Sequence, residues 1–215
     1  MFIESTMIFF CYCYFANYFL AKRLGEQEIW YLLHVTCNTL VVYFCYKDLK
    51  VCLLTPFESF NKIDFTPTAL GLTLGLHLFH IVKYFKKLTF LDWVHHLLSN
   101  VFMTIIGVYY FRLPIWNCGN FFMCGLPGGI DYFLLFLYKV NKIKKTTEKK
   151  YNVYLNNWIR VPGILYTSSL IHIGYINNYI DVEPILIIII QLAILWNALY
   201  FAQRVTLNYG QYISI

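Results

Sequence analysis

The stretch PILIIIIQLAILWNALYFAQ, residues 184–203, contains no charged side chain. A helix needs about 20 predominantly apolar residues to cross the hydrocarbon core of a bilayer. The apolar run is continuous rather than alternating, which argues against a strand of a membrane barrel. The stretch therefore predicts a transmembrane helix and sets the fold class of the chain.

Six more apolar runs precede this stretch, at roughly 5–21, 29–46, 67–86, 88–111, 113–138 and 159–179. No internal repeat is apparent. We therefore expect one domain covering 1–215, an all-α polytopic transmembrane bundle with about seven spans.

The composition supports a membrane location. Hydrophobic residues make up 59% of the chain and charged residues only 13%, against about 25% charged in an average soluble domain. The seven cysteines are an odd number that lies mostly in apolar runs, so they are expected to pack rather than to form disulfides or bind zinc. Glu4 replaces a basic leader region, which favours a retained first span over a cleaved signal peptide.

The basic residues predict the orientation, because cytoplasmic loops of membrane proteins are rich in lysine and arginine. With the N-terminus lumenal or outside and the C-terminus cytosolic, 13 of the 17 basic residues fall inside. The four outside are Lys47, Lys50, Lys62 and Arg112. The Lys139–Lys150 run is expected to be an inner loop that anchors the chain or attracts anionic lipid and acyl-carrier phosphates. We expect the chain to reside in the endoplasmic reticulum or another intracellular membrane.

Ionisable residues gather at one depth of the predicted bundle. At about 1.5 Å per helical residue from the cytosolic ends of the spans, the depths are about 11 Å for His95 and His96, 12 Å for Asp131 and His77, and 8 Å for His80 and His34. Such residues inside spans are costly and usually face the interior and serve function. We expect His95, His96 and Asp131 to be catalytic, with His77, His80 and His34 binding ligand.

Within this layer, Asp92 precedes His95 by three residues and His96 by four, so the three share one helix face. Asp92 could orient an imidazole that acts as a general base; alternatively, it sits near the interface and pairs with Lys86 or Lys87. His77 and His80 share a face as well, but six histidines are few for a membrane di-iron site, so no metal and no bound cofactor are predicted. His172 is expected to pack.

The fifth run is interrupted at Gly125-Leu126-Pro127-Gly128-Gly129. Proline lacks an N–H and clashes with the carbonyl four residues earlier, and the two glycines that follow allow a bend. The helix could restart near Asp131 with free N–H groups that bind a polar ligand; a packing kink is the alternative. Arg160 is expected to anchor the sixth span, or to pair with Asp131 or a ligand phosphate.

The segment Asp92-Trp93-Val94-His95-His96-Leu97-Leu98-Ser99 resembles the HHxxT signature of TLC-domain membrane proteins, the TRAM, Lag1 and CLN8 group. Gly129-Ile130-Asp131-Tyr132-Phe133-Leu134-Leu135 with Lys139 is similar to the family's HDxSDxxLExxK segment. Pro127 and Gly128 occupy the places of the family His and first Asp, Ser99 that of Thr, and Leu135 that of Glu. The motif-bearing core would span about 67–203.

The resemblance implies a helical bundle around a lipid-accessible cavity and a place in lipid metabolism. In ceramide synthases of this family, the paired histidines serve acyl transfer from acyl-CoA to a lipid amine. Asp92-x-x-His95-His96 is also like the HxxHH box of fatty-acid elongases, a lower-ranked alternative.

Three functions remain open at this point. The first is a lipid acyltransferase with acyl-CoA as co-substrate, and the second a non-catalytic lipid-binding, lipid-sensing or trafficking protein. The third is a channel or small-solute transporter, which the clustering of polar residues in one half of the membrane disfavours. Membrane lipids and a possible second copy of the chain are the expected partners, and no nucleic acid is expected.

Overall fold

The computed structural model describes residues 1–61 and 65–213, except for the side chain of Ser99. Lys62, which the orientation argument counted outside, therefore lies beyond the described residues. Helices and turns make up the described part, and no strand occurs in it. The predicted all-α class is confirmed.

The helices join end to end into long runs. α1 (Phe2–Leu20), α2 (Glu26–Leu54), α3 (Thr68–Tyr84) and α10 (Pro184–Ile213) are single elements. The other runs are α4 (Phe90–Val94) with α5 (Met103–Ile106), α6 (Pro114–Asn120) with α7 (Leu126–Lys139), and α8 (Lys145–Leu155) with α9 (Val161–Ile176).

Wider π-helical turns, in which each N–H bonds the carbonyl five residues back, continue or join the paired elements. They cover His95–Phe102, Gly107–Phe111, Phe121–Gly125 and Asn156–Arg160. Short 3₁₀ turns occupy Pro56–Phe60 and Phe85–Lys87.

In the described part of the chain, four helices are long and apolar enough to cross a membrane: Glu26–Leu54, Phe90–Phe111, Pro114–Lys139 and Pro184–Ile213. Seven spans are not confirmed. Several predicted boundaries were too narrow: α2 extends to Leu54 rather than 46, and α10 to Ile213 rather than 203. The apolar pattern marks the lipid-facing part of a helix, whereas the backbone hydrogen bonds continue into polar sequence beyond it. For the same reason, the expected basic loop turns helical at Lys145.

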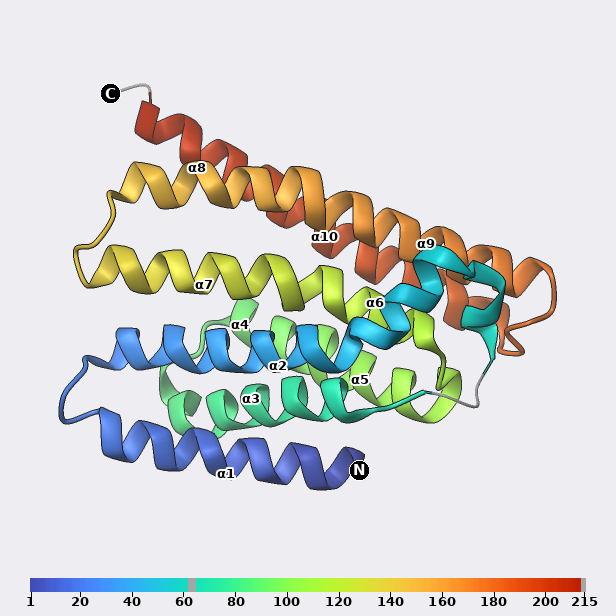
Figure 1. Ribbon diagram of the computed structural model, residues 1–215, viewed down its shortest axis with the longest axis horizontal. Helices are drawn as coiled ribbons and strands as arrows, with labels where there is room; N and C mark the ends of the chain where they lie inside the picture. Colours follow the sequence, from blue (N-terminus) through green and yellow to red (C-terminus); the bar gives the residue numbers. More distant parts are fainter. Residues whose placement is uncertain (62–64, 214–215) are drawn as a thin grey trace.

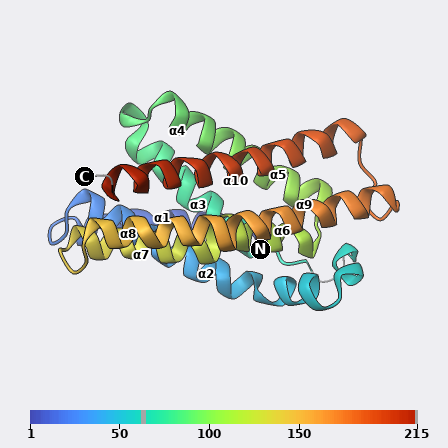
Figure 2. The same ribbon diagram turned by 90° about the horizontal axis from the view of Figure 1, so that it is seen from above.

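The long runs lie side by side with roughly parallel axes (Figure 1). The connections 21–25, 85–89 and 140–144 and the C-terminal end of α10 share one end of the bundle, at the left in Figures 1 and 2. The connection 177–183 and the Pro56–Phe60 turn lie at the opposite end. Successive runs along the chain thus alternate in direction, and α1 and α3, which pack together, run the same way.

The outer surface of α10 is apolar. Ile185, Leu192 and Leu199 are each more than half exposed. Exposed apolar faces of this length are rare on water-soluble monomers. On the same helix, Ile187 and Ile190 are buried in the bundle. Apolar residues on both faces are the arrangement expected of a helix between protein and lipid.

Close backbone contact joins α1 to α3. A Cβ at Gly75 would lie 2.5 Å from the Thr6 carbonyl oxygen and 3.1 Å from the Phe10 nitrogen, and one at Gly71 would lie 2.7 Å from the Phe2 carbonyl oxygen. Small residues four apart let helix backbones approach in membranes. This packing fixes α3, which carries His77 and His80.

A second polar contact ties α6 to α2. The fully buried Asn117 donates from Nδ2 to Asp48 Oδ2 at 2.5 Å and to the Thr66 carbonyl at 2.9 Å. A buried polar group of this kind stabilises only while its partner remains. It holds α2, α6 and the segment before α3 in register.

Candidate functional site

A cavity of about 450 Å³ lies inside the bundle, within the size range of ligand pockets, about 300–1,000 Å³. Its apolar wall includes Leu70, Leu76 and Ile164. Its polar lining includes seven asparagines: Asn38, Asn100, Asn120, Asn152, Asn156, Asn197 and Asn208. Amides are costly in apolar surroundings unless they are hydrogen-bonded, so this lining suits a polar ligand.

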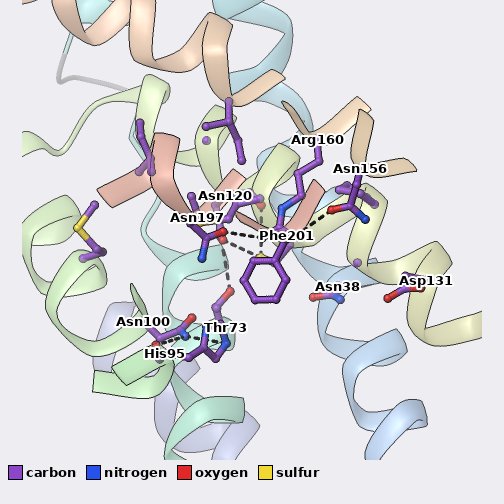
Figure 3. A pocket seen from close by; sticks show the side chains of 18 of the residues that line it. Asn38, Thr73, His95, Asn100, Asn120, Asp131, Asn156, Arg160, Asn197 and Phe201 are labelled. Carbon is purple, nitrogen blue, oxygen red and sulfur yellow. Dashed lines mark hydrogen bonds between the residues drawn. The ribbon is translucent and has the colours of Figure 1, made fainter. Parts of the chain in front are cut away.

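Arg160 projects into this cavity from the turn between α8 and α9 (Figure 3). Its Nη2 donates to Asn197 Oδ1 at 2.7 Å and its Nη1 to Asn156 Oδ1 at 3.3 Å. The guanidinium lies 4.9 Å from the centre of the Phe201 ring. Its Nε is buried and lacks a hydrogen-bond partner. The cation is thus held by neutral amides and an aromatic face rather than by an acid.

Asp131 lines the same cavity from α7. Its Oδ1 is buried without a hydrogen-bond partner. The pairing of Asp131 with Arg160, one of the predicted alternatives, is not formed: no ion pair within 4.0 Å joins them in the described part of the chain. The cavity therefore presents a cation and a carboxylate that do not neutralise each other by direct contact.

The predicted interruption of the fifth run takes a different form. Leu126 N–H donates to the Phe121 carbonyl, so the π-helical turn continues into α7 and Pro127 lies in its first turn. The predicted open half-helix near Asp131 is wrong, because the wider turn accommodates the proline without breaking the run. Pro127 and Gly128 line the cavity, and a Cβ at Gly128 would lie 2.8 Å from Asn38 Nδ2.

Gly129 plays a related packing part. A Cβ at Gly129 would lie 3.4 Å from the Asn38 Cβ, so both glycines let α7 approach α2. Of the three residues predicted to bind a ligand in this segment, Pro127 and Gly128 line the cavity and Gly129 does not.

Five of the six histidines form one array of ring contacts. His80 stacks on Trp30, at 3.7 Å between ring centroids, and on His34, at 4.7 Å, and the Trp30 and His34 rings lie 5.2 Å apart. His34 also stacks on Tyr132 at 3.8 Å. The remaining contacts between histidines are His77–His80 at 5.9 Å, His77–His95 at 5.3 Å, His77–His96 at 5.0 Å, His80–His96 at 5.8 Å and His95–His96 at 5.4 Å. His172 stands apart and is exposed on α9.

The array lies between the large cavity and a second one of about 400 Å³. His34, His77 and His95 line both cavities. The second cavity is bounded by residues of α10, such as Trp196, and by Asp92 and its neighbours. A ligand in either cavity would therefore meet imidazole groups.

Asp92 does not orient the histidines. Its Oδ2 accepts hydrogen bonds from the Thr89 N–H at 2.8 Å and the Thr89 hydroxyl at 2.7 Å, and its own N–H donates to Thr89 Oγ1. This reciprocal pair caps α4. No hydrogen bond joins Asp92 to His95 or His96 among the described residues, and neither Lys86 nor Lys87 pairs with it there. An acidic residue that caps a helix and one that contacts a side chain on the same helix face can have the same sequence spacing. The sequence alone therefore could not distinguish these two roles of Asp92.

Other groups take the orienting role. His77 Nδ1 and His96 Nδ1 are 2.9 Å apart and hydrogen-bonded. Asn100 Nδ2 lies 3.3 Å from His95 Nε2 and donates to the His95 carbonyl at 2.9 Å. The side chain of Ser99, in the place of the TLC threonine, lies outside the described residues. One ring nitrogen from each of His77, His95 and His96 lies within 4.8 Å of the other two, close enough to be considered as metal ligands.

Sequence reasoning missed the asparagines on the cavity wall, together with Trp30, Tyr132 and Phe201. The rule that singled out histidine and aspartate in apolar runs applies to asparagine too, because its amide also needs a partner in the membrane. Extended to asparagine, it selects Asn38, Asn100 and Asn197.

The chain was compared with protein-family models, with curated proteins and with solved structures, and none of the three comparisons finds a match.

Proposed function

We propose that this chain is a seven-span, TLC-like membrane protein of lipid metabolism that binds the phosphate-bearing end of a lipid or an acyl-CoA in the asparagine-lined cavity. We place its N-terminus in the lumen and its C-terminus in the cytosol of an intracellular membrane. The gathering of the connections 21–25, 85–89 and 140–144 at one end supports this orientation, because each carries or adjoins basic residues.

The proposal rests on Arg160, whose guanidinium has no acidic partner within 4.0 Å among the described residues. A guanidinium inside an apolar bundle is costly unless an anion balances it. The described residues supply only amides and a ring within contact distance. A phosphate oxygen in the adjoining cavity would provide charge-assisted, bidentate hydrogen bonds.

The rest of the wall suits such a ligand. Leu70, Leu76 and Ile164 offer an apolar surface for a hydrocarbon chain. Lys149, from the basic Lys139–Lys150 run, also lines the cavity. The run that would attract phosphates therefore adjoins the proposed binding site.

Binding is tested with protein purified in mild detergent. Native mass spectrometry identifies co-purifying lipid, and titrations compare a fluorescent anionic phospholipid, a long-chain acyl-CoA and inorganic phosphate. Arg160→Gln is expected to weaken binding of the lipid or acyl-CoA by about 10-fold to 100-fold, the value of a hydrogen bond to a charged group. Arg23→Gln, at an exposed arginine between α1 and α2, is the matched control and should bind normally. Equal binding by both variants would refute the proposal.

A second candidate function, acyl transfer, rests on His95. This residue lines both cavities, and its Nδ1 is buried without a partner. As a general base it would take a proton from a lipid amine or hydroxyl, which then attacks the thioester carbon of acyl-CoA. The carbon–sulfur bond breaks, and the proton passes to the departing thiolate.

Transfer is measured as free thiol released from acyl-CoA in the presence of candidate acceptor lipids. His95→Gln should abolish release while leaving lipid binding at Arg160 intact, whereas His172→Gln, at the exposed histidine of α9, should have no effect. Binding without any release in the wild-type protein would favour a non-catalytic lipid-binding or trafficking role.

A further inference from the structure

Three histidines from two separate runs converge on one point beside the cavities. His77 belongs to α3, and His95 and His96 open the π-helical turn that follows α4. One ring nitrogen from each lies within 4.8 Å of the other two. His77 and His96 are buried, and His95 is partly buried.

The π-helical backbone explains how two adjacent histidines reach the same neighbour. A π-helix has more residues per turn than an α-helix, so successive side chains are rotated less about the axis. His95 and His96 therefore both contact the His77 ring, at 5.3 and 5.0 Å between centroids. An ordinary helical turn would spread the two rings further apart.

We infer that His77, His95 and His96 form a binding site for a divalent transition metal, with Zn²⁺ as the ion whose geometry suits it. This inference is independent of the proposed lipid binding at Arg160, and it is an alternative to the general-base role of His95, because an imidazole whose acceptor nitrogen binds a metal cannot also accept a proton. Neutral imidazole nitrogen is a preferred ligand of zinc and related ions. In a tetrahedral zinc site with bonds of about 2.0–2.1 Å, ligand nitrogens stand about 3.3 Å apart.

The present spacing brackets that value. The nitrogens of His77 and His96 are 2.9 Å apart and share a hydrogen bond, and all three ligand atoms fall within 4.8 Å. Metal binding would replace the shared proton and draw the His95 ring inward. The ring that gives up this proton takes one on its other nitrogen, so each histidine binds the metal as a neutral imidazole.

The surroundings fit an open rather than a closed metal site. Three protein ligands leave a fourth tetrahedral position for water or substrate. His77 and His95 line both cavities, so that position has space beside it. Asn100, hydrogen-bonded to the His95 carbonyl and 3.3 Å from its ring, would hold the ligand in place as outer partners of metal sites do. A bound zinc ion would polarise a carbonyl or activate water at this position.

The test is titration of the chelator-treated full-length protein in detergent with Co²⁺, a spectroscopic substitute for Zn²⁺, followed by competition with Zn²⁺. One equivalent with visible ligand-field bands of tetrahedral intensity is expected, displaced by Zn²⁺. His77→Gln and His96→Gln should each weaken binding by more than about 100-fold, because loss of an outer partner alone costs about 10- to 100-fold. His172→Gln is the matched control and should bind like the wild type.

Circular dichroism of each variant establishes that it is folded. Zn²⁺ should also raise the unfolding temperature of the wild-type protein, since a ligand that binds only the native state stabilises it. Absence of tetrahedral bands and of a thermal shift in the wild-type protein would overturn the inference whatever the variants do. Stoichiometric binding that survives in folded His77→Gln would overturn it as well.

Discussion

The contact between α1 and α3 gives a prediction whose size follows from the coordinates. In Gly75→Ala, the new Cβ would lie 2.5 Å from the Thr6 carbonyl oxygen, 0.9 Å short of the ordinary contact distance of 3.4 Å. The obstructing atoms belong to the backbone of α1, including the Phe10 nitrogen at 3.1 Å, so no side-chain rotation relieves the clash. The two helices must separate.

Overpacking of this kind costs about 1–3 kcal/mol. Alanine in place of glycine also stabilises a helix by about 1 kcal/mol. A second glycine-to-alanine variant has the same gain without the clash, so comparing the two variants cancels it. Gly210→Ala on α10 adds a Cβ with nothing within 4 Å. We therefore expect the free energy of unfolding of Gly75→Ala to be about 1–3 kcal/mol below that of Gly210→Ala.

The assay is equilibrium unfolding by sodium dodecyl sulfate in mixed micelles, followed by circular dichroism. Because α3 carries His77, the separation should also weaken the contact of 2.9 Å between His77 and His96, and with it Co²⁺ binding. Equal stability of the Gly75→Ala and Gly210→Ala proteins would show that α1 does not pack on α3 as described, and the reasoning would fail.

The same assay checks three more changes. Asn117→Ala should lower the free energy of unfolding by about 1–3 kcal/mol, because the buried Asp48 carboxylate loses a donor at 2.5 Å; an unchanged value would contradict the role of this contact. His80→Phe should raise it by about 1–3 kcal/mol, since both buried ring nitrogens lack hydrogen-bond partners while the stack on Trp30 at 3.7 Å is kept; a loss of stability would point to an unseen partner. Thr89→Ala should cost about 1 kcal/mol through the lost cap of α4, and no change in the unfolding midpoint would argue against that cap.

Much of the fold follows from the apolar pattern. Continuous apolar runs predicted helices, and each predicted run corresponds to helix over most of its length. The side chains that fill these helices, such as Cys13, Cys37 and Cys45, are buried as free thiols, as expected from their place in apolar runs. Helix ends were less predictable because hydrogen bonding continues past the apolar segment, as it does from residue 46 to Leu54 in α2.

The candidate site was predictable in its residue types and less so in its contacts. Depth along the spans grouped His34, His77, His80, His95 and His96, and these rings form one array. The partners within the site were not predictable, because they come from rotations about helix axes that a one-dimensional pattern does not encode.

The amino-acid pattern alone shows that apolar helices form this chain and that costly polar groups recur within them, because both follow from the free energy of placing side chains in an apolar medium. The folded arrangement was needed to see that Asp92 caps α4, that Arg160 contacts Asn197 and Phe201, and that His77 bonds His96. Those choices depend on helix rotation and on the π-helical turns. Both are set by packing between distant segments rather than by any local preference of the chain.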